Sequence, residues 1–241
     1  MEENTYYITQ KNKMIQGLAS YAKPMRSELA VRFGEEEARE MLHDVLDEYA
    51  FLIPKFPYIG GRRNPFTTNL VQAGYGLALY RALHKRGGTL EQAGELIHLG
   101  IELQLKQIPA FLRRWMALYK YSASSIRKMK ERARISHQRR YPGDWVFEVI
   151  DGDGQSFDVG MDFSECGIDK FMRKMGAEAL TPYLCNTDYV LFGACGMELQ
   201  RTKALSWGCD CCNFRIKKNG SMPPAWPPQF LERDCGKKRN G

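Results

Sequence analysis

Residues 207–216, WGCDCCNFRI, hold three cysteines within four positions. A cysteine serves as a nucleophile, as half of a redox pair, as a metal ligand or as a small buried apolar residue. A zinc site would have to combine two of these thiolates with Cys166 and Cys185. The spacing C-x-C-C, however, is not the C-x-x-C spacing of a zinc knuckle. We therefore expect neither a metal nor a cofactor.

Strand alternation separates the three cysteines from one another. If residues 208–216 form one regular strand, Cys212 shares the inward, apolar face with Phe214 and Ile216. Cys209 and Cys211 then lie on the opposite face. Asp210 is placed inward near the start of the strand, where a carboxylate needs a partner or a pocket. A one-residue bulge would reverse part of this pattern.

Three further residues are candidates for chemistry near this strand. Cys212 is the candidate nucleophile, with a buried, inert thiol as the alternative. Asp188, three residues after Cys185, is a candidate general acid or base, with a turn-forming or capping aspartate as the alternative. Arg201 lies among apolar residues and needs a carboxylate, supplied either by a substrate or by an aspartate of the chain.

The segment IGGRRNP offers a second site for an anion. Its two glycines allow close approach of the backbone, and the helix that follows supplies free N–H groups. Arg62, Arg63 and Asn64 would complete a clamp on a carboxylate, although a turn followed by an Asn64 helix cap explains the same residues. The four histidines fall in predicted helices without metal spacing, and we interpret them as structural: His43, His84, His98 and His137.

Hydrophobic periodicity divides the chain into two portions. Residues 1–142 favour helices, over 34–52, 64–88, 89–108 and one long basic helix from Pro109 towards Arg140. Residues 143–220 favour an antiparallel sheet with one short helix: a hairpin over 145–163, the helix within 164–180, and strands over 186–196 and 197–218, the second of them bent or broken near Gly208. The sequence thus predicts an α+β fold, as one integrated domain, followed by a proline-rich charged tail over 221–241.

The net charge of +7 is concentrated in one segment. Residues 111–140 hold ten Lys or Arg and one Glu. A solvated helix face or a contact in a homo-oligomer explains this charge without nucleic acid, for which no motif is present; attraction of a small anion is a further alternative. We expect no nucleic acid partner.

Other features bear on location. No apolar run is long enough to cross a bilayer, and the N-terminus lacks the apolar stretch of a secretory signal. Seven cysteines, an odd number, favour reduced thiols. We expect a cytoplasmic protein with no membrane partner.

The C-terminal pattern resembles the L-2-amino-thiazoline-4-carboxylic acid hydrolase family. The similarity rests on Cys185 and Asp188, on Arg201 and Thr202, on Gly208, and on the stretch Cys212–Arg215, with IGGRRNPFTTNL as a weaker upstream match. Asn213 stands where the family usually has aspartate.

The resemblance implies a hydrolase that opens a C–N or C–S bond of a small carboxylated, amidine-like heterocycle. We predict Cys212 and Asp188 as catalytic, and the following as substrate-binding: Arg201, Arg62, Arg63, Asn64, Cys185 and Asp210. The alternative, prompted by Asn213, is a binding or sensor protein of the same fold that carries out no chemistry.

Overall fold

The computed structural model describes residues 5–228 and Cys235. Its N-terminal portion is helical, as predicted. The helices are α1 (Thr5–Ile8), α2 (Lys11–Ala22), α3 (Arg26–Phe33), α4 (Glu35–Leu52), α5 (Phe66–Lys85), α6 (Leu90–Lys106), α7 (Ala110–Lys120) and α8 (Ala123–Ser136). Thr89 begins α6 with a capping box: its side chain accepts the N–H of Gln92, whose side chain accepts the N–H of Thr89.

The basic segment forms two helices, where we predicted one. Tyr121 ends α7, and its side chain is buried. Ser122 has extended backbone angles, and its Oγ accepts the N–H of Ser125, so it caps α8. The break turns α8 back over the sheet, where it packs against β1 (Val146–Asp151).

The sheet has four antiparallel strands in the order β1-β2-β4-β3. β2 (Val159–Glu165) forms the predicted hairpin with β1, while β3 (Glu198–Gln200) and β4 (Cys212–Lys217) come from the C-terminal part. The predicted short helix is α9 (Gly167–Lys174). The α+β prediction is therefore confirmed.

The predicted strand over 186–196 is wrong, because this segment belongs to helix α10 (Thr181–Ala194). α10 packs against α6 on one side and against β3 on the other, so nearly all of its residues are buried or half-buried. A helix that is covered on all sides lacks the apolar stripe of a surface helix, and its sequence cannot be told from that of a buried strand by periodicity.

Glycine makes the contact between α6 and α10 possible. A Cβ atom at Gly94 would lie 2.0 Å from Cδ1 of Tyr183. The two helices therefore approach each other at a residue without a side chain, which fixes where α10 lies.

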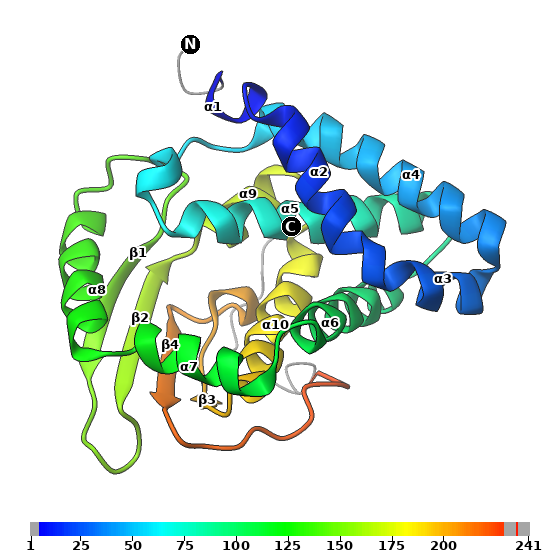
Figure 1. The fold of residues 1–241 in the computed structure, drawn as a ribbon. Helices are drawn as coiled ribbons and strands as arrows, with labels where there is room; N and C mark the ends of the chain where they lie inside the picture. The colour runs from blue at the N-terminus through cyan, green and yellow to red at the C-terminus, as the bar shows by residue number, and fades with distance from the viewer. Residues whose placement is uncertain (1–4, 229–234, 236–241) are drawn as a thin grey trace.

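Figure 1 shows how the parts are arranged. α2, α3 and α4 lie on one side, the sheet and α8 lie on the other, and α5 runs between them behind the front helices. Among the described residues, no helix is both long and apolar enough to cross a membrane.

Candidate functional site

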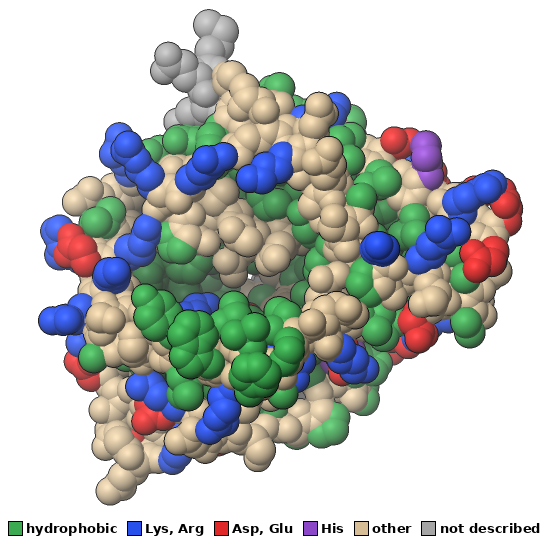
Figure 2. All heavy atoms as spheres, viewed as in Figure 1, with side chains coloured by type: hydrophobic (Ala, Val, Ile, Leu, Met, Phe, Trp, Pro, Cys, Tyr) green, Lys and Arg blue, Asp and Glu red, His purple; other side chains and the backbone are tan. Residues whose placement is uncertain are grey.

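A cavity of about 630 Å³ lies between the helices and the sheet. In Figure 2 it opens as a hollow at the centre of the face shown. Four of the predicted site residues line it: Cys185 and Asp188 from α10, Arg201 after β3, and Cys212 at the start of β4. The fold thus brings together residues that are separated by up to 27 positions in the sequence.

Arg201 is held by partners from within the chain. Only 1% of its side chain is accessible. Its Nη1 donates to Oδ2 of Asp188 at 3.0 Å, and its Nη2 donates to the carbonyl oxygen of Cys185 at 2.9 Å. The guanidinium carbon lies 4.8 Å from the ring centre of Tyr189 and 5.0 Å from that of Phe214. A guanidinium among aromatic faces retains its charge through cation–π attraction and the ion pair.

Asp188 presents a carboxylate to the cavity. It lies within α10, where we had predicted the start of a strand. About a third of its side chain (34%) is accessible, although protein surrounds the residue. Burial raises the pKa of Asp188, and the charge and hydrogen bond of Arg201 oppose this shift. A carboxylate of raised pKa in an enclosed cavity has the properties of a general base.

Three thiols line the same cavity: those of Cys166, Cys185 and Cys212. Burial raises the pKa of each, and that of Cys212 reaches about 12. The N–H of Leu205 donates to Sγ of Cys212 at 3.1 Å. Cys212 is therefore a neutral thiol at pH 7. Within the part of the chain that the structure describes, no group of His, Cys, Asp or Glu side chains is arranged to hold a metal ion.

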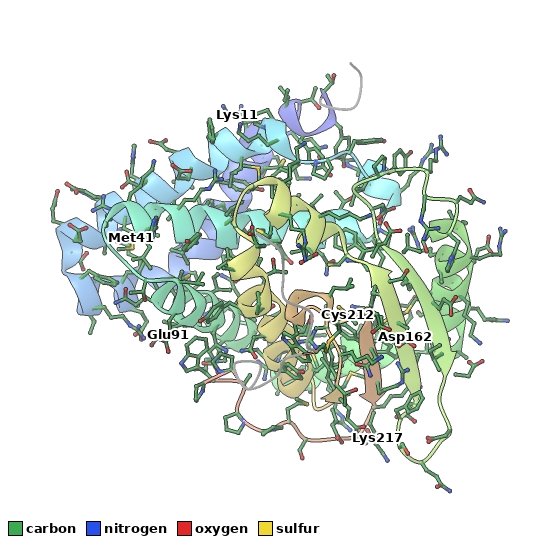
Figure 3. The ribbon with its side chains drawn as sticks, turned by 180° about the vertical axis from the view of Figure 1, so that it is seen from behind. Lys11, Met41, Glu91, Asp162, Cys212 and Lys217 are labelled. Carbon is green, nitrogen blue, oxygen red and sulfur yellow. A yellow bond between two sulfur atoms is a disulfide. The ribbon has the colours of Figure 1, made fainter. Side chains whose placement is uncertain are left out.

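Regular alternation holds only from Cys212 onwards. Cys212 and Ile216 are buried, and Phe214 lines the cavity with Cys212, as predicted. Figure 3 shows Cys212 where β4 begins, between α10 and the strand that carries Asp162. Asp162, on β2, is paired with Arg215 of β4 through two hydrogen bonds.

The predicted break near Gly208 is confirmed, but the faces predicted for residues 208–211 are wrong, because these residues precede β4. Gly208 has a φ of +86° and turns the chain there. As a result Asp210 is exposed, outside the cavity lining, and its Oδ1 lies 3.2 Å from Nζ of Lys203. Cys209, predicted to face outward, is buried and forms a disulfide with Cys235. Our expectation of reduced thiols is wrong for this pair, and the expected cytoplasmic location loses that support.

The predicted anion clamp lies outside the cavity lining. Arg62 and Arg63 belong to a short 3₁₀ turn, Gly61–Arg63, and both are exposed. The Nδ2 of Asn64 donates to Oδ2 of Asp144 and to the carbonyl oxygen of Ile59, each at 2.7 Å. Its Oδ1 accepts the N–H of Phe66 at 2.9 Å. Asn64 therefore has a structural role in the turn before α5, where its side chain accepts the N–H of the first residue of that helix.

We expect Asn64→Ala to lower the free energy of unfolding by about 1–3 kcal/mol, because it leaves the half-buried Asp144 without its amide partner. Urea denaturation measures this loss. Arg62→Ala, at an exposed neighbouring position, is the control and should leave stability unchanged. Equal stability of Asn64→Ala and the control would contradict the structural role.

Several lining residues were not predicted from the sequence. Asn69 and Gln72 are polar residues spaced i, i+3 on α5, and Tyr121 follows α7. Lys128 and Arg132, spaced i, i+4 on α8, also line the cavity. A polar pair among the mainly apolar residues 69–79 was the signal available for Asn69 and Gln72. The cations belong to the basic segment, and their position accords with our alternative that this charge attracts a small anion.

Native thiol labelling at pH 7–8 should modify Cys211 well before Cys212. Cys211 is partly accessible, whereas Cys212 is buried and its pKa is about 12. As the pH is raised towards this pKa, the thiolate fraction of Cys212 increases about tenfold per pH unit. The rate of Cys212 labelling should therefore increase steeply with pH. Peptide mapping after alkylation measures both rates. Faster labelling of Cys212 at pH 7 would contradict its burial.

Asn213 lies on the face of β4 away from the cavity lining. Its Oδ1 accepts the N–H groups of Thr202 and Lys203 at 3.0 and 2.6 Å, and its Nδ2 donates to Oγ1 of Thr202 at 2.8 Å. A carboxylate at this position would accept the same two N–H groups. The exchange of aspartate for asparagine therefore leaves the cavity unchanged.

Comparison with known proteins agrees with the motif. The chain matches no curated protein and no solved structure. The sequence model of the L-2-amino-thiazoline-4-carboxylic acid hydrolase family, whose name denotes a hydrolase, matches residues 68–216. This range begins within α5, contains α6 to α10 and β1 to β3, ends within β4, and includes the four predicted site residues that line the cavity. The chain therefore belongs to the L-2-amino-thiazoline-4-carboxylic acid hydrolase family.

Proposed function

We propose that this protein is a hydrolase that opens a C–N or C–S bond of a carboxylated, amidine-like heterocycle. The observation that carries the proposal is the Arg201–Asp188 pair, which holds a carboxylate in the cavity that Cys212 also lines. An amidinium group has N–H donors and a positive charge, and a carboxylate of this kind complements both.

The two ends of the substrate would meet different groups. Only 1% of the Arg201 side chain is accessible, against 34% of the Asp188 side chain, so Arg201 is a poor partner for a substrate carboxylate whereas Asp188 can meet the amidinium. Lys120, Lys128 and Arg132 line the cavity from α7 and α8, and we assign the carboxylate to these cations. Asp188 and the cations then orient the ring between them.

Cys212 would act as the nucleophile once substrate is bound. The bound amidinium adds a positive charge near the thiol, which lowers its pKa from about 12. Asp188 accepts the thiol proton, Sγ forms a bond to the amidine carbon, and the ring C–S or C–N bond breaks as the leaving atom takes the proton back. Water then hydrolyses the enzyme-bound intermediate and releases Cys212 as a thiol.

The test is turnover of 2-amino-2-thiazoline-4-carboxylate and related cyclic amidines, measured as the appearance of a new thiol or amine. Wild-type protein should open at least one of these rings, and Cys212→Ala should not. Intact-mass measurement during turnover should find the covalent intermediate. Full activity of Cys212→Ala would overturn the covalent step, and no turnover of any such ring would overturn the reaction class.

A binding protein without chemistry is the second candidate. The observation that favours it is the neutral, buried Cys212, whose raised pKa makes the thiol a poor nucleophile. Incubation with the same heterocycles, followed by mass analysis of the released ligand, distinguishes the two functions. Recovery of intact, bound ligand favours this candidate, whereas recovery of an opened ring excludes it.

A further inference from the structure

The cavity is much larger than the head group that Asp188 would bind. Cavities of about 150 Å³ hold a molecule the size of benzene. At about 630 Å³, this cavity has room for roughly four times that volume. Lining residues on α5 extend from Phe66 to Leu79, and thirteen residues of helix span about 20 Å. The free space is therefore elongated along α5.

Polar and apolar groups are segregated along this length. The part next to the sheet and α10 contains Asp188, Arg201 and the three thiols. The part formed by α2, α3, α4, α6 and the 3₁₀ turn Lys23–Met25 is lined mostly by aliphatic side chains: Leu18, Met25, Leu29, Leu42, Val45 and Ile101. A cavity with a charged end and a long aliphatic end complements an amphiphile.

We propose that the ligand is an amphiphile whose amidine-like head lies beside Asp188 and whose apolar chain runs along α5 towards α2–α4. The position of the head rests on the proposed function. The position of the chain rests on the shape and lining of the cavity alone.

Binding of n-alkylguanidinium ions, which carry the head without a scissile ring, tests this proposal. Each methylene that enters the aliphatic end should tighten binding about fourfold, so octylguanidinium should bind roughly 100-fold or more tightly than butylguanidinium. Calorimetry below the micellar concentration measures both constants. Equal affinity of the two ions would overturn the proposal.

Variants locate the chain and the head separately. Ala22→Phe fills the α2 end of the cavity and should abolish the advantage of the octyl chain while leaving butylguanidinium binding unchanged. Ala179→Phe, at an exposed position outside the lining, is the matched control. If Asp188→Asn weakens neither ion but the chain-length effect remains, the chain is supported and the proposed head site is overturned. An octyl advantage that survives Ala22→Phe would overturn the path of the chain.

A separate observation concerns α7, whose apolar face is turned outward. Its exposed residues include Phe111 (76%), Trp115 (63%) and Tyr119 (64%), with Leu112, Met116 and Leu118 beside them. Ala117, on the opposite side, is buried. Figure 2 shows apolar side chains gathered along the lower edge of the hollow, where Figure 1 draws α7. A surface helix of a globular protein has the reverse orientation.

Cations of the basic segment lie on α7 itself and on α8, the helix that follows it. Arg113 and Arg114 are turned towards the protein, where they donate to the carbonyl oxygen of Leu105 and to Oδ1 of Asn219. Lys120, Arg127 and Lys128 of α7 and α8 are exposed, and two of them, Lys120 and Lys128, also line the cavity, where we assign them to the substrate carboxylate. Two copies of the chain that met through α7 would bring two strongly basic segments together, which is unfavourable. Anionic lipid provides both apolar depth for the aromatic residues and negative charge for the cations.

We infer that α7 docks on an anionic membrane surface. This inference departs from our expectation of no membrane partner. That expectation rested on the lack of a segment that could span a bilayer, and a helix that lies in the membrane interface requires no such segment. Docking through α7 would hold the opening of the cavity at the lipid surface, because Tyr119 and Lys120 also line the cavity.

Flotation with vesicles tests this inference. The protein should bind phosphatidylcholine vesicles that contain about one quarter phosphatidylglycerol, and binding should weaken with salt. Phe111→Ser with Trp115→Ser should reduce partitioning at least about tenfold. Val31→Ser with Phe51→Ser removes equally exposed apolar residues elsewhere and should have no effect. Absence of flotation would overturn the inference. Concentration-dependent self-association that the α7 variant abolishes would also overturn it and would make α7 an interface between copies of the chain.

Discussion

Asp188→Asn should reduce kcat/KM for ring opening by about 10²–10⁴, the usual contribution of a general base. The asparagine side chain retains an oxygen that can accept the hydrogen bond of Arg201, so the arrangement of the cavity is preserved. What the substitution removes is the negative charge that binds the amidinium and accepts a proton. Asp210→Asn, at an exposed aspartate outside the lining, is the matched control and should retain full activity.

The pH profile separates this role from a structural one. Asp188 must be ionised to act as a base, so activity falls as the pH drops through its pKa. Because burial raises that pKa, the acid limb should lie above the value of about 3.9 for an ordinary aspartate. In Asp188→Asn the residual activity should lack this limb. An unchanged acid limb in the variant would show that another group is the base.

Arg201→Met should lower the free energy of unfolding by about 3 kcal/mol, because it leaves Asp188 without its cation in an enclosed site. This value is the lower end of the usual loss of stability on breaking a buried ion pair, and it applies because a third of the Asp188 side chain is accessible. The substitution also removes the cation–π contacts of the guanidinium with the rings of Tyr189 and Phe214, which adds to the loss of stability. Thermal unfolding should shift downward by about 10 °C.

A double variant shows whether the lost stability comes from the unpaired charge. Arg201→Met combined with Asp188→Leu removes both charges and should be more stable than Arg201→Met alone, since replacing a whole buried pair costs far less than breaking it. Urea denaturation of the two proteins gives the difference. A double variant that is less stable than the single one would indicate that packing around Arg201, and not its charge, dominates.

The helical portion and the hairpin were predictable because their signals are local. Thr89 and Gln92 form a capping box within four positions, and the strands of the hairpin are neighbours in the sequence. Helix α10 was not predictable, because its type depends on being covered by α6 and β3 from distant parts of the chain. The break at Tyr121 and Ser122 depends in the same way on the burial of one side chain.

Within the candidate site, the sequence placed correctly the residues of the strand that begins at Cys212, because alternation decides which face of the sheet each of them occupies. Asp188 and Arg201 were identified by residue type and motif, although Asp188 was placed on the wrong element. Asp210 was misplaced because a turn at Gly208 interrupts the alternation. Arg62 and Arg63 had suitable chemistry, but the fold directs the cations of α8 to the cavity instead. Which of several arginines faces a cavity is a property of tertiary structure.

The contacts of Asn213 indicate that part of the C-terminal motif serves the fold and is inherited with it. This residue ties β4 to the backbone of Thr202 and Lys203, and its neighbour Arg215 ties β4 to Asp162. These contacts would be needed in any descendant that retains the sheet, whatever reaction it catalyses. Specificity is free to diverge elsewhere, at positions such as Leu42, Val45 and Ala22 that line the far end of the cavity. Chains that share the signature but differ at those positions should therefore share an ancestor and an architecture while acting on different molecules.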